Sequence, residues 1–111
     1  MAIDLFCYLS IDRGAAESDL NKIRSNHSEL FEGKFLISPV RDADFSLKEI
    51  AAEHGLVAES FFLVSLNDKN SADLIPIVSK ILVDGFNGGA ILILQDNEYR
   101  RTSLEHHHHH H

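Results

Sequence analysis

Residues 1–12, MAIDLFCYLSID, decide the fold class, because apolar side chains recur there at every second position. A period of two places these side chains on one face of a β-strand. The other face is polar at its ends and aromatic in its middle, through Phe6 and Tyr8. The pattern predicts a central strand over Met1–Asp12 with a partly covered second face. The side chains of its apolar face are Ile3, Leu5, Cys7, Leu9 and Ile11.

The rest of the chain alternates between helical and strand periodicity. Further strands are predicted over Lys34–Val40, Ser60–Leu66 and Ala90–Gln95. Helices are predicted over Ala15–Phe31, Leu47–His54 and Asp73–Asp84. The loops between these elements are Arg41–Asp44, Asn67–Asn70 and Gly85–Gly89. The resulting order, β-α-β-α-β-α-β, is typical of an α/β sandwich.

The middle helix has the clearest local signals. Ser46 and Glu49 have the spacing of a capping box, in which each side chain satisfies a backbone donor at the other's position. Phe45 and Ile50 have the spacing of a hydrophobic staple. Gly55 suits a left-handed helix end, so the helix is predicted to stop there.

Strand positions follow from proline and from apolar runs. Pro39 cannot donate to a ladder, so the second strand is predicted to lie at an edge or to end there. The fourth strand is apolar on both faces, which favours a central position. Asp73 is predicted to cap the third helix, because Pro76 then falls in the first turn.

We expect a single-domain α/β sandwich with a four-stranded parallel or mixed sheet and three helices. The alternative is a ferredoxin-like α+β fold of two split β-α-β halves, with the short middle helix as an extra element at their join. The middle connection has about 20 residues, and a parallel crossover needs a dozen or more. Connection length therefore allows both arrangements.

The chain has 111 residues, and 104–111 read as a vector-derived purification tag that holds six of the eight histidines. Residues 1–103 have the length of one globular domain. When Glu105 is removed with the tag, the 17 acidic residues become 16 and the formal charge changes from −7 to −6. An acidic chain disfavours nucleic acid and anionic membranes, because both are bound through basic patches. The basic pair Arg100–Arg101 reads as part of a solvated tail.

The remaining totals indicate a soluble cytoplasmic protein. Cys7 is the single cysteine, so no disulfide forms within the chain. The first residues lack the basic region of a signal peptide. No apolar run approaches the ~20 residues of a membrane helix.

The candidate catalytic side chains lack partners at catalytic spacing. Cys7 lies mid-strand on the apolar face and reads as a small core residue. His27 lies on the apolar stripe of the first helix, where no acidic residue is three or four positions away, so it reads as a boundary histidine. His54 ends a helix, where a cation suits the helix dipole.

Metal and phosphate motifs are incomplete. Asp42 and Asp44 form a D-x-D pair, but two carboxylates alone do not complete a cation site. The segment Asp68–Asp73 departs from a calcium loop, since Ala72 stands at a ligand position. The loop glycines lead from a helix into a strand, which is the reverse of a phosphate loop. We therefore predict no cofactor and no metal, and we favour a non-catalytic protein. These loop glycines are Gly85, Gly88 and Gly89.

The first functional hypothesis is a small acidic protein-binding or regulatory domain, of the inhibitor or immunity type, with a basic protein partner. Acidic surfaces speed association with basic proteins, although the same charge also serves solubility. The acids of the predicted loops are Asp12, Asp42, Asp44, Asp68, Asp96 and Glu98.

The second hypothesis is a small-molecule-binding domain, or minor enzyme, with a site at the C-terminal strand ends. Four residues there are candidate contacts for a ligand or partner: Asp12, Asn67, Asp68 and Asp96. An antiparallel sheet would disperse them. Self-association is compatible with either hypothesis, since the second strand is a possible exposed edge that Lys34 and Pro39 blunt.

Overall fold

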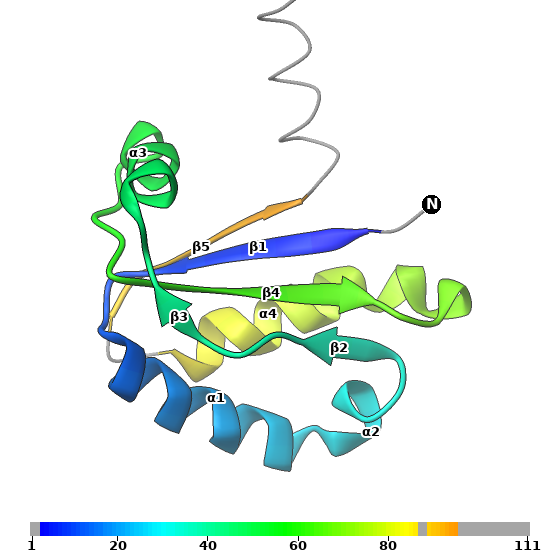
Figure 1. Cartoon of the computed structure of the whole chain (residues 1–111). Coiled ribbons are helices and arrows are strands. Elements are labelled where there is room, and N and C mark those ends of the chain that lie inside the picture. The colour runs from blue at the N-terminus through cyan, green and yellow to red at the C-terminus, as the bar shows by residue number, and fades with distance from the viewer. Residues whose placement is uncertain (1–2, 87–88, 96–111) are drawn as a thin grey trace, which may run out of the picture.

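The computed structural model describes residues 3–86 and 89–95 (Figure 1). Within these residues lie five strands: β1 (Asp4–Leu9), β2 (Phe35–Ile37), β3 (Arg41–Asp42), β4 (Ser60–Leu66) and β5 (Ile91–Gln95). The helices are α1 (Arg13–Asn26), α2 (Ser28–Phe31), α3 (Phe45–Glu53), the 3-10 helix η1 (Lys69–Leu74) and α4 (Ile75–Gly85).

The strands form one sheet in the order β2-β4-β1-β5, and the short β3 pairs with β4 on the same side as β2. Every described strand pair is antiparallel. The prediction of a four-stranded parallel or mixed sheet is therefore wrong, because the described residues form a five-stranded antiparallel sheet. The segment predicted as a loop at Arg41–Asp44 supplies the extra strand, β3.

Two split β-α-β halves interleave to make this sheet. β1 and β2 run in the same direction with β4 between them, and β4 and β5 run in the same direction with β1 between them. This is the connectivity of the ferredoxin-like alternative, with α3 at the join of the halves. The middle connection was long enough for a crossover, but the chain turns through α3 and returns antiparallel, so length could not decide the topology.

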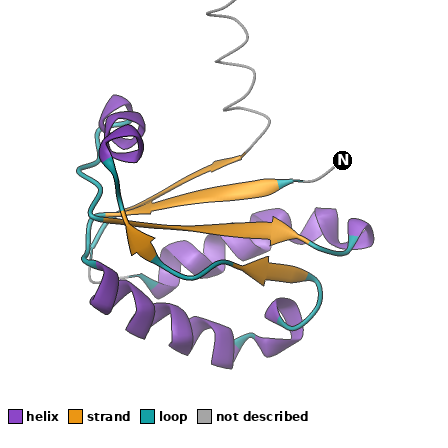
Figure 2. Cartoon of the chain, viewed as in Figure 1, coloured by secondary structure: helices purple, strands orange, loops and turns teal. Residues whose placement is uncertain are grey.

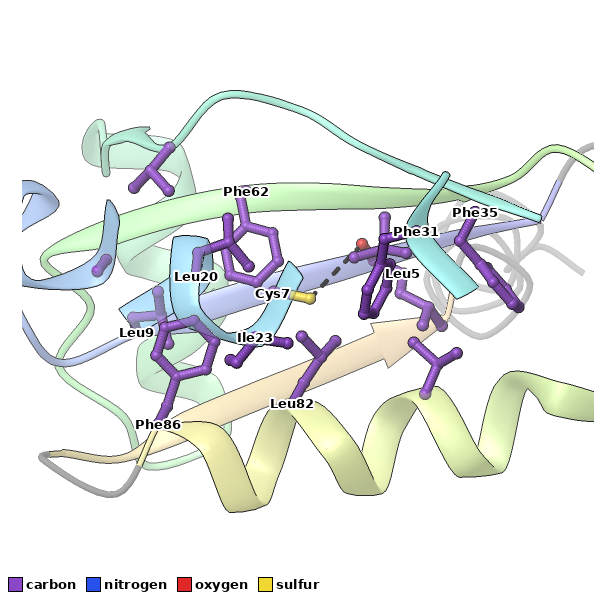
Figure 3. Packing of buried hydrophobic residues seen from close by; sticks show 14 of the residues in the cluster. Leu5, Cys7, Leu9, Leu20, Ile23, Phe31, Phe35, Phe62, Leu82 and Phe86 are labelled. Atoms are coloured by element: carbon purple, nitrogen blue, oxygen red, sulfur yellow. Dashed lines mark hydrogen bonds between the residues drawn. The ribbon is translucent and has the colours of Figure 1, made fainter. Parts of the chain in front are cut away.

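The helices are divided unequally between the two faces of the sheet. Helices α1, α2 and α4 cover one face, whereas α3 lies on the other (Figures 1 and 2). The predicted apolar face of β1 is confirmed, because Leu5, Cys7 and Leu9 are buried in the cluster beneath α1 and α4 (Figure 3). In that cluster the rings of Phe62 and Phe86 lie 5.8 Å apart.

The second face is covered at one end. The rings of Tyr8 and Phe61 lie 5.1 Å apart and are buried with three alanines of the α3 region: Ala43, Ala51 and Ala58. Phe6 and Leu63, which pair across β1 and β4, are half-buried. Leu36 of β2 lies on the same face, since it pairs with Ser65, and its side chain is 52% exposed. The predicted partial cover of this face is confirmed.

The edges of the sheet differ from expectation at β5. β5 was predicted to be central, but among the described strands it pairs with β1 alone, and all five of its side chains are half-buried. The apolar side chains of β5 alternate between the helix-covered face of the sheet and its more open face. In the sequence, this arrangement looks the same as a strand that is buried on both faces. β2 lies at the opposite edge and ends before Pro39, as predicted.

The first helical region is broken rather than continuous. Asp12 caps α1 by accepting a hydrogen bond from the Ala15 amide at 2.8 Å, so α1 begins before the predicted Ala15. At His27 the backbone leaves helical geometry, with φ −131° and ψ 44°. The carbonyl of His27 then accepts from the amides of Leu30 and Phe31, and α2 follows as a separate turn.

The start of α3 was predicted wrongly and its end correctly. Asp44 is the cap, and its Oδ1 accepts from the Leu47 amide at 2.9 Å. Ser46 therefore lies inside the first turn, and Phe45 is 75% exposed, which rules out the staple with Ile50. Gly55 has φ +83°, and a Schellman pattern closes the helix through the amide of Leu56, which donates to Ala51 at 3.0 Å, and that of Gly55, which donates to Ala52.

The last helix begins further along than predicted. Asp73 was predicted to cap this helix. In the structure the capping aspartate is Asp68, and the helix that it caps is the 3-10 helix η1, which precedes α4. The α-helix starts at Ile75, which still places Pro76 in the first turn as predicted.

The cap of α3 can be tested by paired substitutions. We expect Asp44→Ala to lower the free energy of unfolding by about 1 kcal/mol, because an orphan amide loses its acceptor. Ser46→Ala should change it by only a few tenths of a kcal/mol, since alanine is a good helix former within the first turn. Urea unfolding of both variants measures the difference. A larger loss for Ser46→Ala would restore the predicted capping box.

Candidate functional site

The predicted contact residues lie at opposite ends of the sheet. Asp12 follows β1, whereas Asn67 and Asp68 follow β4. Because β1 and β4 are antiparallel, their C-terminal ends are at opposite ends of the sheet. Asp96 lies outside the described residues. The structure therefore does not gather these residues, and the geometric basis for a small-molecule site at the strand ends is lost.

Each described member of this set has a local structural role. Asp12 caps α1. Asp68 accepts from the Asn70 amide at 3.1 Å and from the Ser71 hydroxyl at 3.3 Å. The Asn67 side-chain amide donates to the Gly33 carbonyl at 2.8 Å. Contact between these residues and a partner stays a prediction.

A different set of acids is brought to one end of the sheet, where β1 ends and β4 begins. Glu59 directly precedes β4 and bonds to both neighbouring segments. Its amide donates to the Leu9 carbonyl of β1 at 2.7 Å, and its carbonyl accepts from the amide of Ala43, which follows β3, at 3.0 Å. The Ser60 hydroxyl donates to the Ile11 carbonyl at 2.7 Å, which holds the residues after β1 against the start of β4. Four exposed acids occupy this acidic end: Asp12, Asp42, Asp44 and Glu59.

Each acid reaches the acidic end through a different element. Asp42 belongs to β3, where it pairs with Ser60. Asp12 and Asp44 cap α1 and α3, so the start of each helix lies at this end. Sequence reasoning named the three aspartates as loop acids but missed Glu59, whose position depends on the pairing of β3 and β1 with β4.

Two arginines lie among these acids. Arg13 approaches Asp42 with a nitrogen–oxygen distance of 4.0 Å, and both side chains are exposed. Such a pair contributes little to stability, because solvent screens it. The Arg41 guanidinium lies over the Phe61 ring at 5.2 Å from its centroid. The acidic end is therefore a solvated charged surface. Beside it, the Arg41 cation lies over an aromatic ring.

Cys7 is fully enclosed in the helix-side core, as predicted (Figure 3). Its thiol lies 3.8 Å from the Leu5 carbonyl, to which it donates a weak hydrogen bond. Burial raises the pKa of the Cys7 thiol far above its ordinary value, because the thiolate would be desolvated. A thiol in this state is not an activated nucleophile.

The two histidines of residues 1–103 both stand at helix ends. His27 is half-buried and ends α1, where its amide donates to the Ile23 carbonyl at 3.0 Å. His54 is exposed and ends α3. Within residues 3–86 and 89–95, no group of three or more His, Cys, Asp or Glu side chains is placed to hold a metal ion.

The larger surface hollow lies between α1 and the connection from β2 to β3. Its volume is about 500 Å³, and a neighbouring hollow of about 360 Å³ shares Asn21 and Arg24 with it. The larger hollow is lined by both apolar and polar side chains. It is lined by Glu17, Leu20, Asn21, Arg24, Ile37, Ser38, Pro39 and Val40.

The described residues include no helix long and apolar enough to cross a bilayer. The family model described as CDI System Immunity Component matches residues 1–99, so this chain belongs to that family. Membership of an immunity-component family implies that the binding partner is a protein toxin.

The burial of Cys7 predicts an unreactive native thiol. A small thiol reagent should label the folded protein about a hundredfold more slowly than the unfolded chain, because labelling needs an accessible thiolate. Absorbance of the released chromophore measures both rates. Rapid labelling under native conditions would contradict the enclosed position of this side chain.

The same burial predicts a pH dependence of stability. Folding raises the pKa of Cys7, so the unfolded chain loses the thiol proton first as the pH increases. Stability should therefore fall above about pH 8.5, by up to about 1.4 kcal/mol per pH unit from this group. Urea unfolding at pH 7 and pH 10 measures the change, and Cys7→Ala is the control. Equal pH dependence in both proteins would exclude a contribution from the thiol.

Proposed function

We propose that this protein neutralises a protein toxin by binding it directly, and that the toxin surface it covers is basic. The match to the immunity-component family over residues 1–99 carries the proposal. The formal charge and the acidic end supply its electrostatic part. The lone, buried Cys7 suits a reducing compartment, and we place this binding in the cytoplasm.

The acidic end is the surface that we assign to the first encounter with the toxin. Its four carboxylates come from separate elements but face solvent at one end of the sheet. Charges gathered on one surface steer a partner of opposite sign and raise the association rate. The attraction extends about 10 Å at 0.1 M salt, so it acts before the surfaces touch.

The predicted contact residues divide under this proposal. Asp12 belongs to the acidic end and also caps α1. Asn67 and Asp68 lie at the opposite end of the sheet, so they contact the toxin only if it wraps around the molecule. Their substitution therefore separates a local interface from an extensive one.

Neutralisation is tested by co-expression with the cognate toxin of the same system. Cells that produce the toxin alone should stop growing, and cells that also produce this chain should grow. The purified pair should elute as a stoichiometric complex, because inhibition by binding requires one. Protection of cells without any complex at low salt would overturn direct binding as the mechanism.

The electrostatic part is tested by neutralising the two acids of the acidic end that cap no helix. The double variant Asp42→Asn/Glu59→Gln should reduce the association rate with the toxin about tenfold at low salt, and the loss should shrink as salt is added. The matched control, Glu29→Gln/Asp73→Asn, removes the same charge from exposed positions on α2 and η1. Stopped-flow or surface-binding kinetics measure both. Equal effects of the two variants would show that net charge, rather than the acidic end, sets the rate.

A further inference from the structure

On the side away from β1, β5 has no strand partner among the described residues, and it presents backbone groups there in a defined pattern. The Ser10 amide donates to the Ala90 carbonyl at 3.0 Å, and β1 and β5 continue in register from this pair. Hydrogen-bonded pairs alternate in an antiparallel ladder, so Leu92 and Leu94 bond to β1. Ile91, Ile93 and Gln95 therefore direct their N–H and C=O groups away from β1, toward a side where no described strand lies.

This edge lacks the features that usually prevent strand addition. Its sequence, ILILQ, contains no charge and no proline, and its five residues form a regular strand. The opposite edge, β2, has three residues and is flanked by Lys34 and Pro39. Natural proteins protect exposed edges with charges, prolines or short strands. β2 is short and has such residues at its flanks, whereas the five residues of β5 include none, although Asp96 follows them in the sequence.

We propose that a second copy of this chain pairs antiparallel along β5, so that one sheet runs through both protomers. The outward residues must face one another for hydrogen bonds to form. The register that pairs all of them places Ile93 on the twofold axis, and Ile91 then faces the partner's Gln95. Three such pairs would make about six backbone hydrogen bonds.

The side chains of β5 suit this pairing. Leu92 faces the partner's Leu94 on the sheet face that α3 covers only at one end, where both side chains are half-buried in the single protomer. Pairing removes more of their apolar surface from water. No charged side chain faces another within the paired strands, so the segment is complementary to itself.

The antiparallel arrangement also separates the two acidic ends. β5 begins beside Leu9, at the acidic end of its own protomer, and finishes beside Leu5 at the other end. Rotation about Ile93 brings the start of one β5 to the finish of the other. The acidic ends therefore lie at opposite ends of the joint sheet, which limits repulsion and leaves both accessible.

Light scattering coupled to size-exclusion chromatography tests the proposal. The expected mass of the 111-residue chain is twice its 12.5 kDa. A chain without residues 104–111 should also elute at twice its own mass. Gln95→Pro and Ile91→Pro each remove one outward N–H without removing a hydrogen bond to β1, and each should yield the monomer mass with an unchanged circular dichroism spectrum. The matched control is Ile37→Pro, which removes an outward N–H from the β2 edge and should leave the dimer mass.

A second measurement follows the interface directly. The Ile93 amide should exchange slowly with deuterium in the wild type and at least tenfold faster in Gln95→Pro. A monomeric wild type overturns the proposal, whether the Ile93 amide exchanges quickly or is protected by another part of the same chain. Loss of the dimer in Ile37→Pro alone would also overturn it, by placing the interface at β2. A wild-type monomer whose β5 variants fail to bind the toxin would assign the edge to a toxin strand instead.

Discussion

β1 is hydrogen-bonded along both of its edges, to β4 on one side and to β5 on the other, and both pairings are antiparallel. The positions of the helices follow from this constraint. The chain must pass over β4 to reach β2 from β1, and over β1 to reach β5 from β4. Both passages use the same face, where α1, α2 and α4 bury Leu5, Cys7 and Leu9. The short α3 is left to the other face, which it covers only in part.

The same pairings determine where the polar groups meet. In a parallel sheet, the residues after β1 and β4 would share one edge, whereas here Asp12 and Asp68 lie at opposite ends. The end of β1 instead meets the start of β4, where Glu59 and Asp42 are found. An acidic surface, which we propose for protein contact, thus takes the place of the predicted ligand edge. It is consistent with membership of an immunity-component family, whose partners are protein toxins.

Local patterns predicted elements well where one residue type permits one conformation. Ser60–Leu66 is a strand with the predicted bounds, and Gly55 takes the left-handed conformation that ends α3. Predictions were wrong where two local solutions had similar energies. Aspartate and serine are both good caps, so local sequence does not choose between Asp44 and Ser46. In the structure β3 ends at Asp42 and α3 begins at Phe45, which makes Asp44 the cap. The break at His27 has no signal in the helical periodicity, because the stripe continues on both sides of it.

The sequence by itself determined the alternating faces of β1, the order of the main elements, the acidic charge and the burial of Cys7, since these depend on side-chain period and composition. Only the tertiary structure decided strand direction, the position of β5 at the edge of the described sheet and the gathering of acids around Glu59. The physical reason is that backbone hydrogen bonds between strands do not depend on which side chains the strands carry. Connections of this length also allow two strands to pair either parallel or antiparallel. Strand pairing across the sheet therefore set which surface carries the charge.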